Sequence, residues 1–424
     1  MDLDTHQRER RYRRMCRVAG LAALGLLGTA LYWTVRLERA DWLFVRGDAP
    51  SIRQAIRLAP GNAEYYSFLA QAEPDRAVEI LKEGVALNPL DSSLRLELGL
   101  AAQQQGDFPN AEINMLDAMR LDTGFGPRWA LSDFYFQRRD AERFWPVVRA
   151  ALAMSYGDVS AQFRNCRALA SDPQTILERA IPDRPAVWRK YLDFLLAEGP
   201  LDAADPVADK VLASADNDAV PSLLNYCDKV LAKGRGDEAL LVWNGLARRK
   251  LIPYPELAAG AGEIPVNGDF RAELGHGFDW QFSAPDGIYA NRTLPPSGLI
   301  LSFSGQQSEN TGILSQYVPL LPHRRYVLKV RYRVSGIGAE SGLMCILVLP
   351  DGQDALNGRG LLPGGEGNLE QTLPFQSADR ATLGRLVFGY HRMLGTTRIE
   401  GSLTLQDFAL TLGAVQGVGQ GDDR

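Results

Sequence analysis

The chain has 424 residues, of which 46% are hydrophobic and 23% charged, an ordinary composition for folded protein and enough for two or three domains. This composition excludes a broadly disordered chain. The formal net charge is −5 and no long basic run follows the first 20 residues, which excludes the usual basic nucleic-acid binder.

The N-terminus combines a basic tail, residues 1–17, with an uncharged apolar run, residues 18–35. As a helix rising about 1.5 Å per residue, this run is ~27 Å long, just enough for a bilayer core. The tail holds six arginines, so the positive-inside rule predicts a cytoplasmic N-terminus and folded parts beyond the membrane. We predict a single-pass signal anchor; a signal peptide cleaved near Gly28-Thr29-Ala30 is the alternative.

Residues 48–260 have a helical pattern, with apolar residues at three- and four-residue spacing and breaks at Gly, Pro or Asp. Small residues and turn residues recur within this region. One unit contains Asn88-Pro89, Leu98-Gly99, Gly106-Asp107, Ala111 and Ala118. It resembles a tetratricopeptide (TPR) repeat, in which small side chains lie where two helices cross.

The spacing of these residues repeats along the chain. Ala77 precedes Ala111 by 34 residues, and Gly84 precedes Ala118 by the same 34. Further on, Trp188, Gly199 and Ala204 match three residues that lie 35 positions later: Leu223, Gly234 and Ala239. We expect five or six hairpins; the units at 61–89 and 160–184 fit the pattern poorly.

The TPR resemblance implies a solenoid that binds a protein or peptide on the concave face lined by its first helices. The register predicts which side chains face inward, although each of them could equally belong to a solvated helix face. These partner-binding candidates are Gln103, Gln104, Phe134, Arg138, Arg189, Asp193 and Asp228. Trp129, Trp188 and Trp243 are predicted to be hairpin core.

Residues 264–413 have a different pattern, in which short apolar or alternating runs are separated by Gly, Pro, Asn and Ser. The predicted strands are Leu299–Phe303, Ile313–Val318, Tyr326–Val334, Leu343–Leu349, Leu386–Tyr390 and Leu403–Leu412. Strands of this length and punctuation predict a β-sandwich. Residues 414–424 are predicted to be a flexible tail.

Three stretches of this region resemble jelly-roll carbohydrate-binding modules. They are Val266-Asn267-Gly268-Asp269-Phe270 with Gly277-Phe278-Asp279-Trp280, Ser315–Leu320 with Tyr326–Val330, and Leu403–Leu410. The resemblance implies a jelly-roll fold, but jelly rolls serve many functions. Together with the TPR pattern and the anchor, it implies a bacterial inner-membrane protein with periplasmic domains, similar to accessory factors of cell-envelope or exopolysaccharide assembly.

Sugar binding would need exposed aromatic rings with polar neighbours. The glycan-binding candidates are Tyr289, Trp280, Asn291 and Arg292; Trp280, close to the opening strand, could instead be core. Related modules often hold a structural calcium near their terminal strands, which makes Asp269 and Asp407 candidate ligands. We predict no other cofactor.

The sequence contains no motif for phosphate, dinucleotide or zinc binding and no nucleophile elbow. The four cysteines lack metal-ligand spacing and are predicted to be free and buried, with a Cys166–Cys227 disulfide as the alternative. We therefore expect a non-catalytic, membrane-anchored scaffold that binds a protein partner and a glycan. A purely structural interaction protein is the second hypothesis, and a glycan-active enzyme the third.

Overall fold

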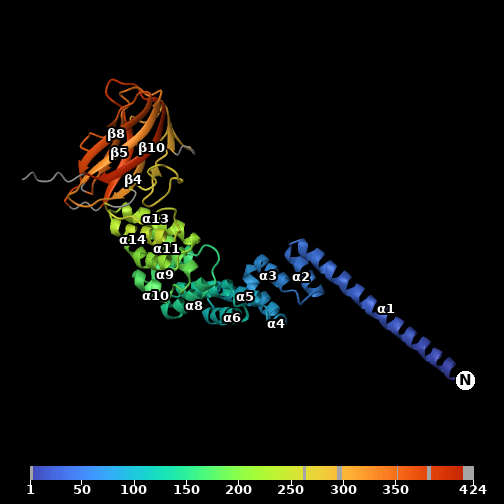
Figure 1. The fold of residues 1–424 in the computed structure, drawn as a ribbon. Helices are drawn as coiled ribbons and strands as arrows, with labels where there is room; N and C mark the ends of the chain where they lie inside the picture. The colour runs from blue at the N-terminus through green and yellow to red at the C-terminus, as the bar shows by residue number, and fades with distance from the viewer. Residues whose placement is uncertain (1–2, 261–263, 294–297, 351, 380–382, 414–424) are drawn as a thin grey trace, which may run out of the picture. The chain divides into compact units, whose positions relative to one another are not determined.

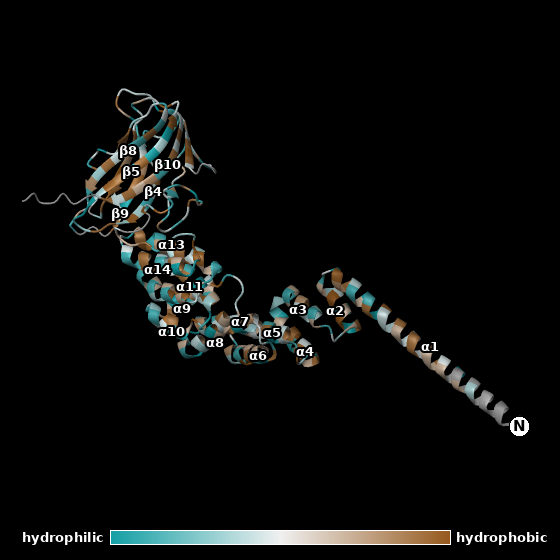
Figure 2. Ribbon diagram, viewed as in Figure 1, coloured by the Kyte–Doolittle hydropathy of each residue, from teal (hydrophilic) through white to brown (hydrophobic). Residues whose placement is uncertain are grey.

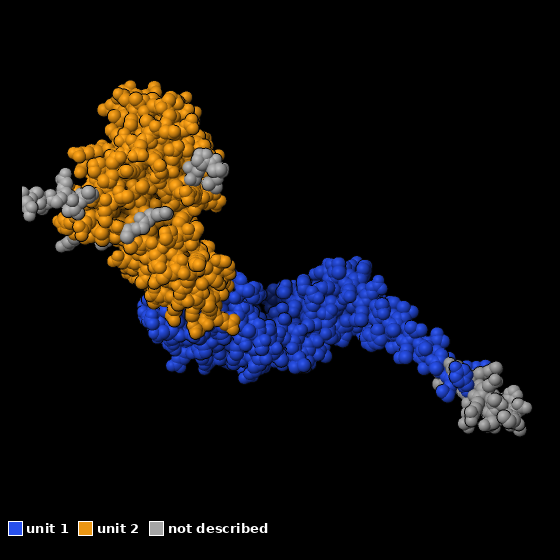
Figure 3. Space-filling model, in the orientation of Figure 1, with its two compact units in different colours: residues 1–182 blue, residues 183–424 orange. Residues whose placement is uncertain are grey.

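The computed structural model describes residues 3–260, 264–293, 298–350, 352–379 and 383–413; the predicted tail, 414–424, lies outside this set. The chain forms two compact units, residues 1–182 and 183–424 (Figure 3). The change from helices to strands occurs inside the second unit. The division by compactness therefore does not coincide with the division by secondary structure that the sequence suggests.

The first unit is helical. Its helices are α1 Leu3–Val45, α2 Ala49–Leu58, α3 Ala63–Ala72, α4 Ala77–Leu87, α5 Ser92–Gln104, α6 Phe108–Leu121, α7 Phe125–Gln137, α8 Ala141–Ala153, α9 Ser160–Leu169 and α10 Pro173–Arg179, with a 3-10 turn at Pro74–Arg76 (Figure 1). Aspartate or asparagine side chains accept hydrogen bonds from first-turn amides of α2, α3, α5, α6, α8 and α10. These caps explain why each helix begins where it does.

Helix α1 is apolar and exposed in its middle and buried near its end. The segment Ala19–Val45 is long and apolar enough to cross a membrane (Figure 2). No residue of its most apolar window is buried. By contrast, Ala40 and Leu43 belong to the same core as Ile52 and Ala55 of α2. Residues 36–45, for which the sequence predicts no element, therefore continue α1 into a first hairpin with α2.

The helices cross where small residues allow close approach, as the repeat pattern predicts. A Cβ atom at Gly84 of α4 would lie 2.8 Å from the ring of Tyr66 in α3. A Cβ atom at Gly99 of α5 would lie 2.8 Å from Met115 and 3.1 Å from the carbonyl oxygen of Ala111 in α6. Both distances are shorter than ordinary van der Waals contact, so glycine is required at these crossings.

The second unit opens with further hairpins. Its helices are α11 Pro185–Glu198, α12 Asp205–Ala213, α13 Val220–Leu231 and α14 Gly236–Arg248, with 3-10 turns at Leu201–Ala204 and Asn217–Ala219. Ala204 and Ala239, predicted to be equivalent, are both fully buried. In the described chain, residues 63–248 form six hairpins, from α3–α4 to α13–α14, and the poorly fitting units are the short hairpins α3–α4 and α9–α10.

The remaining described part of the second unit consists of strands. They are β1 Gln281–Phe282, β2 Ile288–Thr293, β3 Gly298–Ser304, β4 Asn310–Pro319, β5 Arg325–Ser335, β6 Leu343–Val348, β7 Leu361–Leu362, β8 Gly367–Gln376, β9 Leu383–His391 and β10 Glu400–Leu412. They form two antiparallel sheets, in the orders β1-β4-β9-β6-β7 and β2-β3-β10-β5-β8. The six predicted strands are confirmed as β3, β4, β5, β6, β9 and β10.

The two sheets pack face to face around an apolar core. Along β5 the residues alternate between buried and exposed, as predicted for a strand with one face toward the core and the other toward solvent. Phe303 of β3 contacts Tyr390 of β9 across the core, with ring centroids 6.5 Å apart. Trp280 lies between Phe270 and Phe408, at centroid distances of 5.8 and 4.9 Å.

Candidate binding surfaces

Two of the four predicted partner contacts in the first unit lie on the surface of α5. Gln104 is exposed, and the side chain of Gln103 donates a hydrogen bond to Gln137 of α7 at 2.8 Å. This bond joins neighbouring first helices of two hairpins. Gln103 and Gln104 therefore lie on the first-helix face that the TPR resemblance implies.

Phe134 near the end of α7 and Arg138 directly after it both contact the ring of Phe108. Phe134 is only 3% exposed and packs against Phe108 and Tyr135, so its prediction as a partner contact is wrong. The helix turns this side chain toward Phe108 of α6 and into the core. Arg138 is exposed, and its guanidinium lies 4.1 Å from the centre of the Phe108 ring, where it covers the core from outside.

An apolar strip on the first helices was not predicted from the sequence. Phe68 of α3 is 46% exposed, and its ring meets that of Phe44 of α1 at a centroid distance of 5.0 Å. Leu100 of α5 is 39% exposed, and buried residues directly follow both Phe68 and Leu100. Exposed side chains of this size are candidates for protein contacts. The 34-residue repeat does not indicate this pair, because it aligns Phe68 with the buried Ala102.

In the second unit, Arg189 and Asp193 lie on α11. Arg189 forms ion pairs with Asp216 at 3.1 Å and Asp218 at 3.6 Å, so its charge is already matched. Asp193 is exposed. Of these two predicted contacts, Asp193 is the one that leaves its charge open to a partner.

Asp228 of α13 joins the last hairpin to the sandwich. Its carboxylate accepts hydrogen bonds from the Gly277 amide at 2.6 Å and the Gln281 side chain at 2.9 Å, and it pairs with Nδ1 of His276 at 2.7 Å. Both carboxylate oxygens are thus occupied by residues of the same unit. Asp228 positions the start of the sandwich and is not open to an external partner, contrary to its prediction.

Apolar and polar contacts beside Asp228 complete this joint. Trp243 of α14 stacks on Tyr254 at 5.4 Å and meets the edge of Phe278 at 5.7 Å. The Tyr254 hydroxyl donates to Asp279 at 2.5 Å. Burial raises the pKa of the Asp279 carboxyl, because removal from water penalises its charged form more than its hydrogen bonds favour it.

A hollow of about 540 Å³ opens beside this joint and is called the junction hollow. It is lined by Asp228, Ala232, Leu274, Gly275, His276, Trp280, Gln281, Phe282, Tyr317 and Arg385. Tyr317 of β4 and Arg385 of β9 are cross-strand neighbours, and the guanidinium lies 5.8 Å from the tyrosine ring centre. Arg385 also donates to the Ser315 hydroxyl at 3.2 Å.

The predicted glycan residues fall on both sides of one sheet. Tyr289 of the edge strand β2 is 68% exposed and pairs with Ser302, and Asn291 on the same face is also exposed. Arg292 is half-buried and donates to the carbonyl oxygen of Arg271 at 2.6 Å. Trp280 has no exposed surface, so its prediction as a sugar platform is corrected: it is a core residue.

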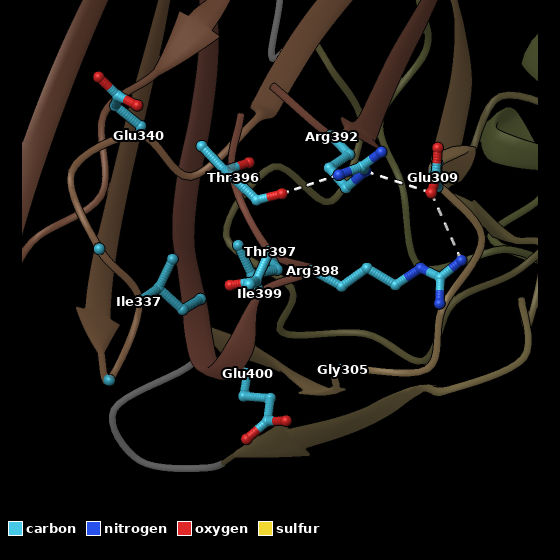
Figure 4. Close-up of a pocket in the computed structure, with 12 residues that line it drawn as sticks. Gly305, Glu309, Ile337, Glu340, Arg392, Thr396, Thr397, Arg398, Ile399 and Glu400 are labelled. Carbon is cyan, nitrogen blue, oxygen red and sulfur yellow. Dashed lines mark hydrogen bonds and ion pairs between the residues drawn. The ribbon is translucent and has the colours of Figure 1, made fainter. Parts of the chain in front are cut away.

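A larger hollow of about 860 Å³ lies at one end of the sandwich and is called the loop-end hollow (Figure 4). Its charged residues are Arg392, Arg398, Glu309, Glu340 and Glu400. Glu309 forms ion pairs with Arg392 at 3.2 Å and with Arg398 at 3.6 Å. Figure 4 shows Glu340 and Glu400 on other parts of the rim. Arginine donors and carboxylate acceptors therefore both line this hollow, as polyhydroxylated ligands require.

The predicted calcium ligands, Asp269 and Asp407, line one small hollow of about 290 Å³. Asp269 pairs with Arg271 at 2.7 Å and Asp407 with Arg331 at 2.7 Å. Within the ranges described above, no group of three or more His, Cys, Asp or Glu side chains could hold a metal ion. The two aspartates are thus near each other, with an arginine at each.

Cys166, Cys227 and Cys345 are free and buried, so the alternative of a Cys166–Cys227 disulfide is wrong. Burial raises the pKa of the Cys166 thiol to about 12, since the thiolate would lose its hydration. It raises the pKa of the Cys227 and Cys345 thiols as well. None of these three thiols is the exposed, easily ionised kind that acts as a nucleophile.

No protein-family model and no curated protein matches the chain. Among solved structures, it is similar to one titled "CBM4 structure and function", with 8% identity and a TM-score of 0.28, over 35% of this chain and 98% of that one. It is similar to MamA, with 16% identity and a TM-score of 0.27, over 43% and 90% of the two chains. It is also similar to YrrB, titled a TPR protein with an unusual peptide-binding site, with 15% identity and a TM-score of 0.24, over 49% and 94%.

Helical-hairpin repeats joined to a two-sheet antiparallel sandwich define the class of this chain. Identities and TM-scores of this size carry no functional argument. We therefore base the functional assignment on the geometry of the chain itself.

Proposed function

We propose that this chain is a non-catalytic scaffold held in a membrane by α1, with a protein partner on its helical hairpins and a glycan on its sandwich. One observation carries the proposal. The middle of α1 is an uncharged apolar run whose leucines are exposed, while Ala40 and Leu43 in its last turns belong to the core of the first hairpin. Such a segment is stable only in lipid or against another apolar surface.

The arginine-rich tail supports a cytoplasmic N-terminus, with the hairpins and the sandwich outside the cytoplasm of a bacterial cell. There they would act in assembly of the cell envelope or of an exported polysaccharide. A signal peptide cleaved near residue 30 would leave the first hairpin intact, because the buried part of α1 begins later.

The protein partner binds the first helices of the first unit. Phe68 and Leu100 supply exposed apolar contacts there, and Gln103 and Gln104 supply polar ones. A partner segment with spaced apolar side chains fits such a surface, since apolar anchors dominate the binding energy and polar groups set the register.

Glycan binds the sandwich at Tyr289 and its neighbours or at the loop-end hollow. Tyr289 offers an exposed ring face and Asn291 an amide beside it. The loop-end hollow offers arginine donors and carboxylate acceptors for hydroxyl groups. Both arrangements combine the features by which proteins bind sugars.

The joint at Asp228 favours a second candidate function, in which the sandwich only closes the last hairpin. Trp243 of α14 is buried under Tyr254 and Phe278, so the sandwich covers an apolar end that a terminal repeat would otherwise expose. In that case the sandwich would bind no sugar.

Two measurements test the proposal. Alkaline carbonate extraction with protease protection of a C-terminal tag should leave the full chain in the membrane pellet, with its tag outside the cytoplasm. A glycan array probed with the full chain in nanodiscs should then show binding. A soluble chain or a cytoplasmic tag would refute the anchoring, and a blank array would leave the capping function as the assignment for the sandwich.

A further inference from the structure

The junction hollow is built by two parts of the second unit. Asp228 of α13 and Ala232, directly after this helix, form one wall, and Tyr317 and Arg385 of the sheet β1-β4-β9-β6-β7 form the other. The segment 274–282, which Asp228 holds through His276, Gly277 and Gln281, closes it between them. The hollow therefore exists only while the hairpin and the sandwich are joined.

The charges in the hollow are matched unequally. Asp228 has three hydrogen-bond partners, which use both of its carboxylate oxygens. Arg385 is exposed, and its contacts among the described residues are the Ser315 hydroxyl and the Tyr317 ring, with no carboxylate. Most of its five donor positions are open, which suits a carboxylate bound by two parallel hydrogen bonds.

Aromatic groups lie next to this cation. Tyr317 and Phe282 are half-buried and line the hollow, so part of each ring is open to it. Sugar rings pack their C–H faces on such surfaces while polar groups hold their substituents. A ring face beside an unmatched arginine selects for a ligand that carries both an apolar face and an acid.

We propose that the junction hollow binds an acidic sugar residue, a uronate within a polysaccharide, with its carboxylate on Arg385 and its ring against Tyr317 and Phe282. The inference rests on the proposed glycan recognition by the sandwich and names the chemical class of one ligand. It adds a site whose second wall is a helical hairpin, so glycan binding and the stability of the joint are linked.

The fixed network around Asp228 explains why the site is ready to bind. The three donors hold the segment 274–282 in place, so Phe282 and Gln281 need not be ordered by the ligand. Preorganised groups lose less conformational entropy on binding and so give higher affinity. Arg385 is held in a similar way by Ser315 and by its contact with Tyr317.

The test compares three probes on the full chain in nanodiscs, because many detergents carry sugar head groups. The probes are tetragalacturonate, its fully methyl-esterified form and a hexaglutamate peptide. Calorimetry should show binding of tetragalacturonate and at least about tenfold weaker binding of the neutral ester, since the charge-assisted hydrogen bonds to Arg385 are lost. The peptide should bind no better than the ester, because it lacks a ring face.

Variants then locate the site. Arg385→Gln should weaken tetragalacturonate binding roughly 10- to 100-fold, and Tyr317→Leu should weaken both saccharides. Arg333→Gln, an exposed strand arginine of the other sheet, is the matched control and should change nothing. Thermal melting of each variant, followed by circular dichroism, shows that the fold is kept.

Each other outcome overturns the inference. Unchanged affinity in Arg385→Gln would mean that the acidic ligand binds at another site. Equal affinity for the acid and the ester would mean that the ligand's charge is not recognised. Tighter binding of the peptide than of the saccharides would mean that the hollow binds protein. If neutral array glycans bind but tetragalacturonate does not, the inference fails while the proposed glycan function stands. If no glycan binds at all, both fail.

Discussion

Gly84 and Gly99 lie where helices cross, and the space at each is smaller than a methyl group requires. We predict that Gly84→Ala lowers the free energy of unfolding by about 1–3 kcal/mol, because the new Cβ would meet the buried Tyr66 ring at 2.8 Å. The measurement is chemical denaturation followed by circular dichroism.

Gly126 provides a matched control in the same repeat array. It is a helical glycine of α7, and apart from its chain neighbours and the backbone of its own helix no atom lies within 4 Å of its Cβ position. Gly126→Ala should therefore leave stability unchanged or raise it by about 0.5 kcal/mol, since alanine favours the helix. Equal effects of the two substitutions would mean that the crossing at Gly84 is not tightly packed.

The buried Asp279 makes stability depend on pH. Its pKa in the folded state lies above the ordinary 3.8, so the folded protein binds a proton more readily than the unfolded chain. Its contribution is complete below the unfolded pKa and is lost as the pH rises through the folded pKa. We predict that wild type loses stability relative to Asp279→Asn as the pH rises from about 3 to about 7.

Urea denaturation across this pH range measures the difference in unfolding free energy between wild type and Asp279→Asn. Asp286→Asn, at an exposed position, is the control. If the difference in unfolding free energy between wild type and Asp279→Asn is the same at every pH, the carboxyl keeps its ordinary pKa despite its burial.

At single positions of a helix, the sequence does not distinguish buried from exposed side chains that lie one turn apart. Phe134 and Arg138 are four residues apart in sequence, yet one is core and the other is exposed. Trp280 was recognised as a possible core residue, but only the packing of Phe270 and Phe408 around it decides this. Hydrogen-bond networks such as that of Asp228 join residues about 50 positions apart, and no local pattern indicates them.

At the scale of elements, α1 continues from an exposed apolar helix into a hairpin, and Arg36 ties it to α2. Its guanidinium donates to the Leu58 carbonyl at 2.7 Å, at the end of α2 where carbonyls lack helical partners. We predict that Arg36→Gln lowers the local opening free energy of α2 by about 1 kcal/mol. Amide hydrogen exchange in α2 is the measurement.

Arg39→Gln, one turn later on the exposed side of α1, is the control and should leave exchange in α2 unchanged. Unaltered protection in Arg36→Gln would mean that apolar packing alone joins the two helices. The exposed part of α1 could then change its orientation without affecting the hairpin.

The strands predicted from the sequence are those with the most regular pattern of buried residues. The six predicted strands are interior strands of the two sheets, whereas the four that were missed, β1, β2, β7 and β8, are the four edges. Edge strands are short or polar on their free side, so their pattern is weak. Pro374 lies within β8, which is tolerated because an edge strand has unpaired amides.

At the scale of the whole molecule, composition and compactness divide the chain differently. Composition changes near residue 260, where helices give way to strands, but the compact unit begins at residue 183 and includes α11 to α14. The reason is the joint: Trp243, Tyr254 and Phe278 share one apolar cluster, which no change in composition reveals. Helical repeats next to a sandwich therefore act as its structural support.

This joint predicts how fragments behave. A fragment of residues 183–413 should melt at least about 5 °C above a fragment of residues 264–413. Phe278 and Leu383 are buried in the intact unit and lie against Trp243 and Gly236 of α14, so removal of the helices exposes them. A third fragment, 249–413, restores Tyr254 and its bond to Asp279 without the helices and should fall between them. Differential scanning calorimetry at equal concentrations is the measurement. If the three fragments melt together, the sandwich is independent of α13 and α14, and the junction hollow has no stable second wall.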